Sequence, residues 1–134
     1  AAAARGLDGI VWLDDSLPLV PRLRARGERF DLALLAAVWM HLDAEERRQG
    51  MPRLAALLSP GGCAVLSLRH GPVPPGRRMF AVGAEETVEL AERAGLQLVR
   101  RLEAPSLQSA NRLAGVTWTW LAFQSPSRLR ASVG

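Results

Sequence analysis

Short apolar runs alternate with longer polar segments along the chain, a pattern that predicts strands alternating with helices. Three runs, at residues 9–13, 30–38 and 63–68, lie beside turn-forming residues and are predicted to be strands. The second run opens the stretch FDLALLAAVWMHL at residues 30–42, which begins aliphatic and ends in a Trp, a Met and a His. Its length and flanks favour a strand buried on both faces, although periodicity alone leaves a helix open.

The segment after this stretch has the pattern of a helix start. Asp43 and Glu46 have the spacing of a capping box, in which each side chain accepts a hydrogen bond from the other residue's backbone N–H. A helix is therefore predicted to run from here toward Leu58. Pro52 lacks a backbone donor and clashes with the preceding turn, so we expect a kink or a break near residue 50.

The remaining predicted elements are a helix or turn at 19–30, a helix at 84–94, and strands at 96–103 and 116–124. The last strand carries Trp118 and Trp120 on one face, and both are predicted to pack against a helix. Residues 71–78 hold three prolines and two glycines and predict an exposed loop. The order of strands and helices predicts an α/β fold with a largely parallel sheet and an antiparallel end.

At 134 residues the chain fits one domain, which we expect to span residues 1–124 and to precede a flexible tail at 125–134. No apolar run approaches the roughly 20 residues of a membrane-spanning helix, so a soluble protein without membrane contact is predicted. The single cysteine, Cys63, lies in an apolar run and is predicted to be a buried small hydrophobe. This composition fits a cytoplasmic protein, and the opening AAAARG lacks the apolar segment of a signal peptide.

The charge pattern says little about partners. All seventeen basic residues are Arg, and the net charge of +4 is spread along the chain and interleaved with acidic residues. A nucleic-acid interface would more often gather positive charge on one face with aromatic residues between. The sequence therefore carries no clear nucleic-acid signal, and no metal site is predicted.

The order and spacing of these segments resemble the carboxyl-terminal two-thirds of class I S-adenosylmethionine-dependent methyltransferases. The most specific matches are FDL at residues 30–32, which opens the middle strand, and LSPGG at residues 58–62 before the next strand. The resemblance implies a Rossmann-like sheet, mostly parallel with an antiparallel C-terminal strand pair and lacking the family's first two strands. It also implies S-adenosylmethionine as the cofactor. Two of the family's cofactor-binding parts, the glycine-rich loop after the first strand and the acidic residue after the second strand, would precede Ala1. We expect weak or undetectable cofactor binding if that segment is missing.

The resemblance further implies where ligands bind. Cofactor contacts are implied at Asp14, Asp15, Ser16, Leu17, Ala36, Ala37, Val38 and Trp39. Asp15 is the first choice for the adenine amino group, and the simpler alternative is an Asp that caps the turn before Pro18. Arg69 and His70 match the end of the family's fifth strand, where substrate is commonly met.

Other polar residues have two interpretations each. Arg77 and Arg78 could bind an anionic substrate through bidentate contacts, or they belong to a solvated loop. His41 and His70 are the candidates for a catalytic base, and His41 could instead be a structural donor beside the helix cap. Methyl transfer needs little beyond holding the nucleophile and the sulfonium in line, so a catalytic residue need not exist.

In the family's sheet order, the missing strands would lie beside the strand from Asp31 to Val38. This aliphatic edge could pair with another copy, be covered by residues 9–13, or be covered by a segment outside this sequence. A homodimer or larger assembly is predicted if the chain begins at Ala1. Two functions follow: a methyltransferase acting on an unidentified acceptor such as a small molecule, or a non-catalytic α/β remnant that is a self-associating or partner-binding module.

Overall fold

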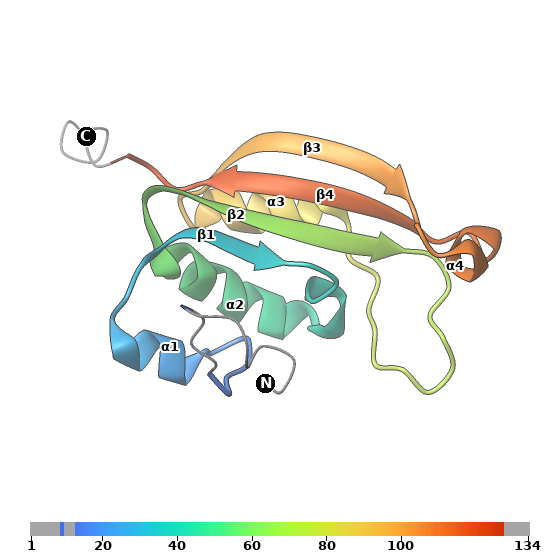
Figure 1. Cartoon of the computed structure of the whole chain (residues 1–134), viewed down its shortest axis with the longest axis horizontal. Coiled ribbons are helices and arrows are strands. Elements are labelled where there is room, and N and C mark those ends of the chain that lie inside the picture. Colours follow the sequence, from blue (N-terminus) through green and yellow to red (C-terminus); the bar gives the residue numbers. More distant parts are fainter. Residues whose placement is uncertain (1–8, 10–12, 128–134) are drawn as a thin grey trace.

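The computed structural model describes residue 9 and residues 13–127, which form one mixed sheet with α2 and α3 against one face (Figure 1). The strands are β1 (Phe30–Leu35), β2 (Leu58–His70), β3 (Gln97–Pro105) and β4 (Thr117–Gln124). The helices are α1 (Pro21–Arg26), the short 3-10 helix η2 (Trp39–His41), α2 (Ala44–Leu57), α3 (Ala84–Arg93) and α4 (Ser109–Leu113). Most of the strand predicted at residues 9–13 lies outside the described residues.

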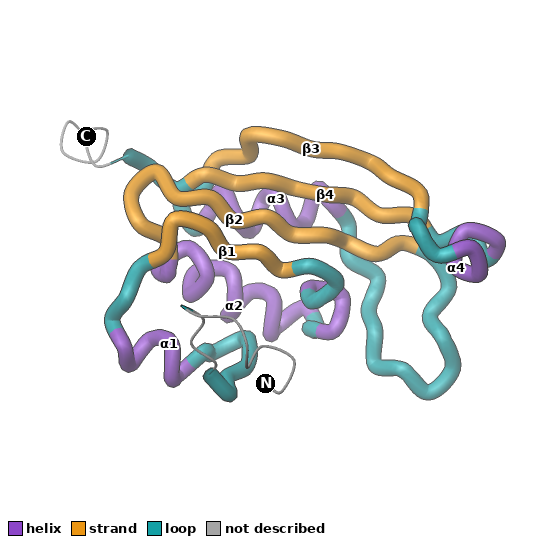
Figure 2. Tube along the Cα trace, in the orientation of Figure 1, coloured by secondary structure: helices purple, strands orange, loops and turns teal. Residues whose placement is uncertain are grey.

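The strand order in the sheet is β1-β2-β4-β3. β1 and β2 are parallel, whereas β4 runs antiparallel to both β2 and β3. The predicted α/β fold with an antiparallel end is therefore confirmed, and among the described strands the parallel part is the β1–β2 pair. Figure 2 shows the single sheet layer with the helices behind and below it. In this part of the chain β1 pairs with β2 alone, so it is an edge strand.

The hydrophobic core lies between the sheet and helices α2 and α3. Along β4, the side chains of Thr119, Leu121 and Phe123 alternate with half-buried ones and are almost completely buried. Fully burying one large apolar side chain contributes about 1.5–3 kcal/mol, so this face supplies much of the folding free energy. Other members of the core cluster are Leu66 and Leu68 of β2, Met51 and Leu54 of α2, and Ala91 of α3.

The opposite face of the sheet is open, which corrects two predictions. Leu32 and Leu34 of β1 are 61% and 63% exposed, so β1 is not buried on both faces. Trp118 and Trp120 lie on this open face as well, because the residues that alternate with them on β4 are the ones buried against the helices. The two indoles therefore face away from α2 and α3, although Trp118 still contacts the core cluster, and the predicted packing against a helix is not observed for these two helices. Cys63, predicted to be buried, is partly exposed.

β1 is shorter than the predicted strand. The chain leaves the ladder after Leu35 because Ala37 adopts a positive φ of 57° and its N–H donates to Ser67 Oγ at 2.8 Å. A backbone donor that binds a side chain in this way cannot continue the strand pairing. Trp39 consequently begins η2 and does not end a strand.

The LSPGG segment forms an irregular beginning of β2, where the register with β1 shifts. The Ser59 hydroxyl lies 2.6 Å from Asp31 Oδ1 and 3.1 Å from the Phe30 carbonyl oxygen. A Cβ atom at Gly62 would lie 2.9 Å from the carbonyl oxygens of Phe30 and Ser59. Only glycine lets the two backbones approach this closely, which explains its place in the segment.

α2 begins with the predicted capping box. Asp43 Oδ1 accepts from the Glu46 N–H at 2.8 Å, and Glu46 Oε1 accepts from the Asp43 N–H at 2.9 Å. Of the kink or break predicted near residue 50, the break is wrong, since the helix continues to Leu57 with Pro52 inside it. The kink stays a prediction. Pro52 lies on the exposed side, where water can satisfy the carbonyl group that loses its helical partner.

Beyond β3 the chain forms α4, for which the sequence pattern predicted no element. After β4, the Ser125 N–H donates to the Gly62 carbonyl at 2.8 Å, and the Gly61 N–H donates to the Pro126 carbonyl at 3.1 Å. Backbone contacts with the sheet thus reach Pro126, past the predicted domain end at residue 124. Most of the predicted tail lies outside the described residues. Within the described part, no helix has the length and apolar character needed to cross a membrane.

Candidate functional site

The parallel strands β1 and β2 end at the same edge of the sheet, the edge at which open α/β sheets bind ligands. Beside the end of β1 lies a cavity of about 490 Å³, here called the loop cavity. Its lining includes Asp15, Ser16 and Leu17 from the loop before α1, and Ala37, Val38 and His41 from the turn after β1. The structure therefore brings together two segments that the resemblance assigned to one cofactor.

Backbone strain is present on two sides of the loop cavity. Val20 has a φ of 38° and Ala37 a φ of 57°, and both residues line the cavity. L-residues with side chains rarely adopt this left-handed region, and a β-branched one does so least of all. Such strain persists where the surrounding structure holds it, and it clusters at ligand sites. At Ala37 the holding contact is the hydrogen bond to Ser67.

Asp15 has backbone partners for both carboxylate oxygens. Oδ2 accepts from the Leu23 N–H in the first turn of α1 at 2.8 Å, and Oδ1 accepts from the Ser16 N–H at 3.1 Å. Asp15 therefore caps the first turn of α1, whose N-cap residue Val20 has no side-chain cap, and this differs from the turn before Pro18 that was considered for it. Asp15 also lines the loop cavity. Asp14 is exposed and lies outside the cavity lining.

His41, at the rim of the loop cavity, is joined to the loop after β2. Its Nδ1 lies 3.1 Å from the Arg78 carbonyl oxygen, and Arg78 Nη1 donates to the His41 carbonyl at 2.6 Å. Arg78 also pairs with Glu46 at 2.9 Å and with Asp43 at 3.4 Å. Arg78 is thus bound to the capping box of α2. Its guanidinium is neither free to contact a substrate nor surrounded by solvent alone. Arg77 forms no ion pair within the described residues.

This arrangement lowers the pKa of the Glu46 carboxyl below its usual value. The first cause is the hydrogen bond from the Asp43 backbone N–H, and the second is the hydrogen bond from the Arg78 guanidinium. Both contacts favour the ionised carboxylate. The start of α2 therefore stays negatively charged near neutral pH and holds Arg78 in place.

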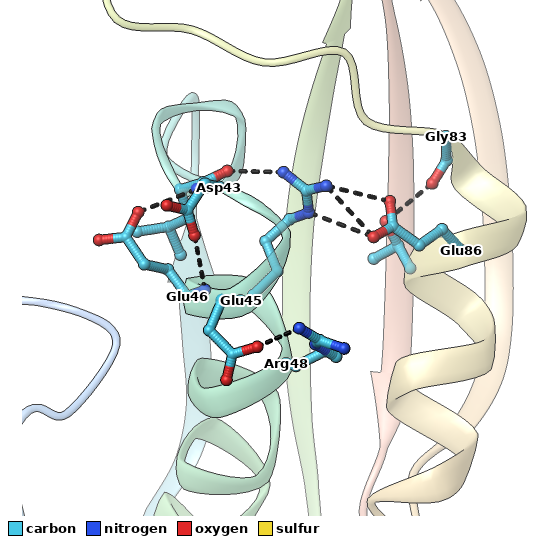
Figure 3. A network of polar contacts seen from close by, with 9 residues as sticks. Asp43, Glu45, Glu46, Arg48, Gly83 and Glu86 are labelled. Atoms are coloured by element: carbon cyan, nitrogen blue, oxygen red, sulfur yellow. Dashed lines mark hydrogen bonds and ion pairs between the residues drawn. The ribbon is translucent and has the colours of Figure 1, made fainter.

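A second network joins the starts of α2 and α3. Figure 3 shows its α3 member, Glu86, and the neighbouring capping box of Asp43 and Glu46. The Arg47 side chain is almost fully buried and donates from Nη1 to the Leu42 carbonyl at 2.6 Å. Its Nη2 lies 3.2 Å from Glu86 Oε1. The guanidinium thus ties the turn after β1 to both helices at one side of the loop cavity.

Trp39, an implied cofactor contact, lies elsewhere. Its side chain is 0% exposed and belongs to the core cluster, and it does not line the loop cavity. Because β1 ends before it and η2 redirects the chain, the indole points into the core and packs near Gly50. This position gives no support to a cofactor contact, and packing is the role that the structure assigns to Trp39.

Arg69 and His70 line a separate cavity of about 230 Å³ at the end of β2. Arg69 Nη1 donates to the Pro72 carbonyl at 2.8 Å, and His70 Nε2 lies 2.7 Å from Thr119 Oγ1. Both side chains therefore have partners inside the protein. The structure groups them with the loop after β2 and does not bring them into the loop cavity.

A cavity that the sequence interpretation missed lies on the open face of the sheet. It has a volume of about 380 Å³ and is here called the tryptophan cavity. Trp118 and Trp120 line it together with Ala36, Ala37, Ser67, residues 104–108 and Asn111. Ala37 lines both this cavity and the loop cavity. The shared face of the two Trp residues was the one signal in the sequence that could have indicated this site.

No known protein-family model matches the chain, and no curated protein matches it. Solved structures do match. The N-methyltransferase NodS from Bradyrhizobium japonicum WM9 with S-adenosylhomocysteine is 26% identical, with a TM-score of 0.57, over 75% of this chain and 48% of that one. A 1,6-didemethyltoxoflavin-N1-methyltransferase from Burkholderia thailandensis is 22% identical, with a TM-score of 0.60, over 74% of this chain and 45% of that one.

A third match extends over most of the chain. An O-methyltransferase family protein from Burkholderia thailandensis is 21% identical, with a TM-score of 0.64, over 94% of this chain and 39% of that one. The chain thus spans about half the length of these three solved structures, or less. These matches agree with the topology described above.

Proposed function

We propose that the chain forms a carboxyl-terminal part of a class I S-adenosylmethionine-dependent methyltransferase. The proposal is supported by the shared fold. The proposed reaction moves a methyl group from S-adenosylmethionine to a small-molecule acceptor. The observation that carries the proposal is the loop cavity, in which residues 15–17 meet residues 37–38 at the carboxyl end of β1. NodS, the first match above, was solved with S-adenosylhomocysteine, the product form of this cofactor.

The residues of the loop cavity fit this cofactor in size and chemistry. Its volume of about 490 Å³ lies within the usual range of roughly 300–1,000 Å³ for small-molecule sites. Leu17 and Val38 offer apolar surface for an adenine ring, and Asp15 offers a carboxylate for its amino group. The bound cofactor supplies an electrophilic methyl group on a sulfonium. The chain's own contribution is positioning, since the fold holds the turn at Ala37 in one conformation before any ligand arrives.

Calorimetry with S-adenosylhomocysteine tests this proposal on the chain as it stands. Val38→Arg places a charge in the loop cavity and should abolish the binding heat. Val73→Arg is the matched control, because Val73 is a similarly exposed valine outside that cavity (46% against 36% exposed). Equal binding by both variants would contradict the site. If the unmodified chain does not bind S-adenosylhomocysteine, the self-associating module described below remains as the candidate function.

Asp15→Ala separates the two roles of that carboxylate. Loss of the cap on α1 should lower the free energy of unfolding by about 0.5–2 kcal/mol, measured by urea denaturation. Loss of a charge-assisted cofactor contact should also weaken S-adenosylhomocysteine binding by about 1.5–3 kcal/mol. A dissociation constant that does not change, in a variant that has lost stability, would limit Asp15 to capping.

The second candidate function is a self-associating module, and the open edge of β1 favours it. Unpaired strand edges with large apolar side chains are templates for pairing with another chain. Leu32 and Leu34 are more than half exposed on this strand. Sedimentation velocity should then detect a dimer that Leu34→Lys dissociates, whereas Leu107→Lys, at an exposed position outside β1, should leave it intact. A folded monomer at all concentrations would remove this candidate.

A further inference from the structure

We propose that the tryptophan cavity binds a neutral, planar aromatic molecule. If the proposed function holds, this molecule is the methyl acceptor, and that second statement rests on the proposed function. The cavity occupies the open sheet face at the carboxyl edge, beside the turn that ends β1. Its volume of about 380 Å³ suits a small ring system.

Among the residues that the structure describes, none that lines the tryptophan cavity is Arg, His, Asp or Glu. This is unusual in a chain with seventeen basic and thirteen acidic residues. The loop cavity, by contrast, contains Asp15 and His41, and the cavity at the end of β2 contains Arg69 and His70. A charged ligand would lose its hydration here without gaining a counter-charge, and that cost is large. The cavity therefore selects an uncharged molecule.

The two indoles supply a flat apolar surface. Trp118 and Trp120 are two positions apart on β4, so both project from the same face of the sheet. On β2, Trp120 is paired with Ser67 and Trp118 with Arg69; on β3, Trp120 is paired with Leu102 and Trp118 with Ala104. Each indole thus has one small neighbour, Ser67 or Ala104, and both indoles stay half-buried. Indole faces of this kind favour stacking with another aromatic ring, which explains the preference for a planar ligand.

Neutral polar groups stand around this surface. Asn111 Nδ2 donates to Gln108 Oε1 at 2.7 Å, which leaves Asn111 Oδ1 as an acceptor and Gln108 Nε2 as a donor without a partner in the described part of the chain. Ser67 Oγ accepts from the Ala37 N–H. A few neutral donors and acceptors at an apolar wall orient a ligand that carries a hydroxyl, carbonyl or ring nitrogen.

The position of Ala37 links this cavity to the proposed reaction. Because Ala37 lines both cavities, the two adjoin at this residue, and the proposed reaction needs their ligands to approach each other there. There a lone pair of the acceptor would form a bond to the methyl carbon. The carbon–sulfur bond would break with its electron pair going to sulfur, and the acceptor's proton would leave to water. The absence of an ionisable group in the tryptophan cavity agrees with a transfer that depends on positioning.

The test uses 1-naphthol as a neutral bicyclic probe and 1-naphthoate as its charged match. In ¹⁵N–¹H spectra of the full chain, 1-naphthol should shift the indole N–H signals of Trp118 and Trp120 and the side-chain amide of Asn111. 1-Naphthoate should bind at least about tenfold more weakly, which corresponds to a difference of about 1.4 kcal/mol in binding free energy. Equal binding of the two probes, or shifts confined to other residues, would overturn the proposal.

Two variants locate the site. Trp120→Leu removes one stacking surface, and Ala36→Leu fills the cavity while keeping both indoles, so the second variant stands in if the first does not fold. Each should weaken 1-naphthol binding at least about tenfold, whereas Leu32→Ala, on the open face of β1 outside the cavity, should not. An equal loss in Leu32→Ala, or no loss in Ala36→Leu, would overturn the assignment.

Titrating the same sample with S-adenosylhomocysteine separates this inference from the proposed function. Binding of 1-naphthol without S-adenosylhomocysteine would support the aromatic site and count against the acceptor role. Binding of S-adenosylhomocysteine without 1-naphthol would overturn the aromatic site and leave the methyltransferase proposal standing.

Discussion

Replacing Arg47 by Met tests whether the buried guanidinium holds the starts of α2 and α3 together. The Arg47 side chain is 6% exposed, whereas that of its partner Glu86 is 40% exposed. Met keeps the length of the apolar stem but removes the charge and the donor to the Leu42 carbonyl at 2.6 Å. Glu86 can recover water, so its loss of a partner adds little.

The magnitude follows from these contacts. A hydrogen bond from a charged donor contributes about 1.5–3 kcal/mol, and the relief of guanidinium desolvation offsets part of this. Arg47→Met should therefore lower the free energy of unfolding by about 1–3 kcal/mol. Glu86→Gln should cost a similar amount because it leaves a buried charge with a weaker partner. The double variant should cost no more than Arg47→Met alone, which gives a coupling of about 1 kcal/mol or more.

Urea denaturation followed by circular dichroism measures these differences through the shift in midpoint at a constant slope. Arg48→Met is the matched control, because Arg48 pairs with Glu45 on the same helix (Figure 3). Both of these side chains are about 60% exposed. The cost of Arg48→Met should stay within about 0.5 kcal/mol. Additive effects in the double variant, or equal losses for Arg47→Met and Arg48→Met, would refute the reasoning.

Gly62→Ala should destabilise the fold by about 1–3 kcal/mol, because its Cβ would meet two backbone oxygens at 2.9 Å. Gly50→Ala, where the nearest atoms are at 3.6 Å in a helix, should be neutral or stabilising, and equal effects in urea denaturation would contradict this. For Glu46, the folded pKa lies below the usual value of 4.5, so its contribution to stability is present above that pH and is lost as the pH falls through the folded pKa. An NMR titration should show this lowered pKa, and Arg78→Ala should raise it. A Glu46 pKa that Arg78→Ala leaves unchanged would exclude the ion pair as a cause.

Local signals in the sequence predicted the elements well. The capping box of Asp43 and Glu46 gave the start of α2, and the alternation at residues 116–124 gave β4. The break expected at Pro52 does not occur, because an exposed helix side tolerates a missing hydrogen bond when tertiary contacts hold the rest. Local sequence signals thus identified the helices and strands, whereas packing decided that α2 continues through Pro52.

The candidate site was harder to predict, because alternation says which side chains share a face and not which face a helix covers. The sequence placed Trp118 and Trp120 on one face correctly, but their surroundings depend on where α2 and α3 pack. In the same way, the run from Phe30 to Val38 looks like one strand. The strand ends at Leu35, because the Ser67 hydroxyl of β2 binds the Ala37 N–H.

That hydroxyl explains why one turn can serve two cavities. Ser67 lies in β2, is almost fully buried, and takes the Ala37 N–H out of the strand ladder. The bond stabilises a left-handed conformation that an alanine would otherwise avoid. The turn then exposes Ala37 toward the loop cavity on one side and the tryptophan cavity on the other. The Ser67 hydroxyl is therefore what fixes the turn that the two proposed binding sites share.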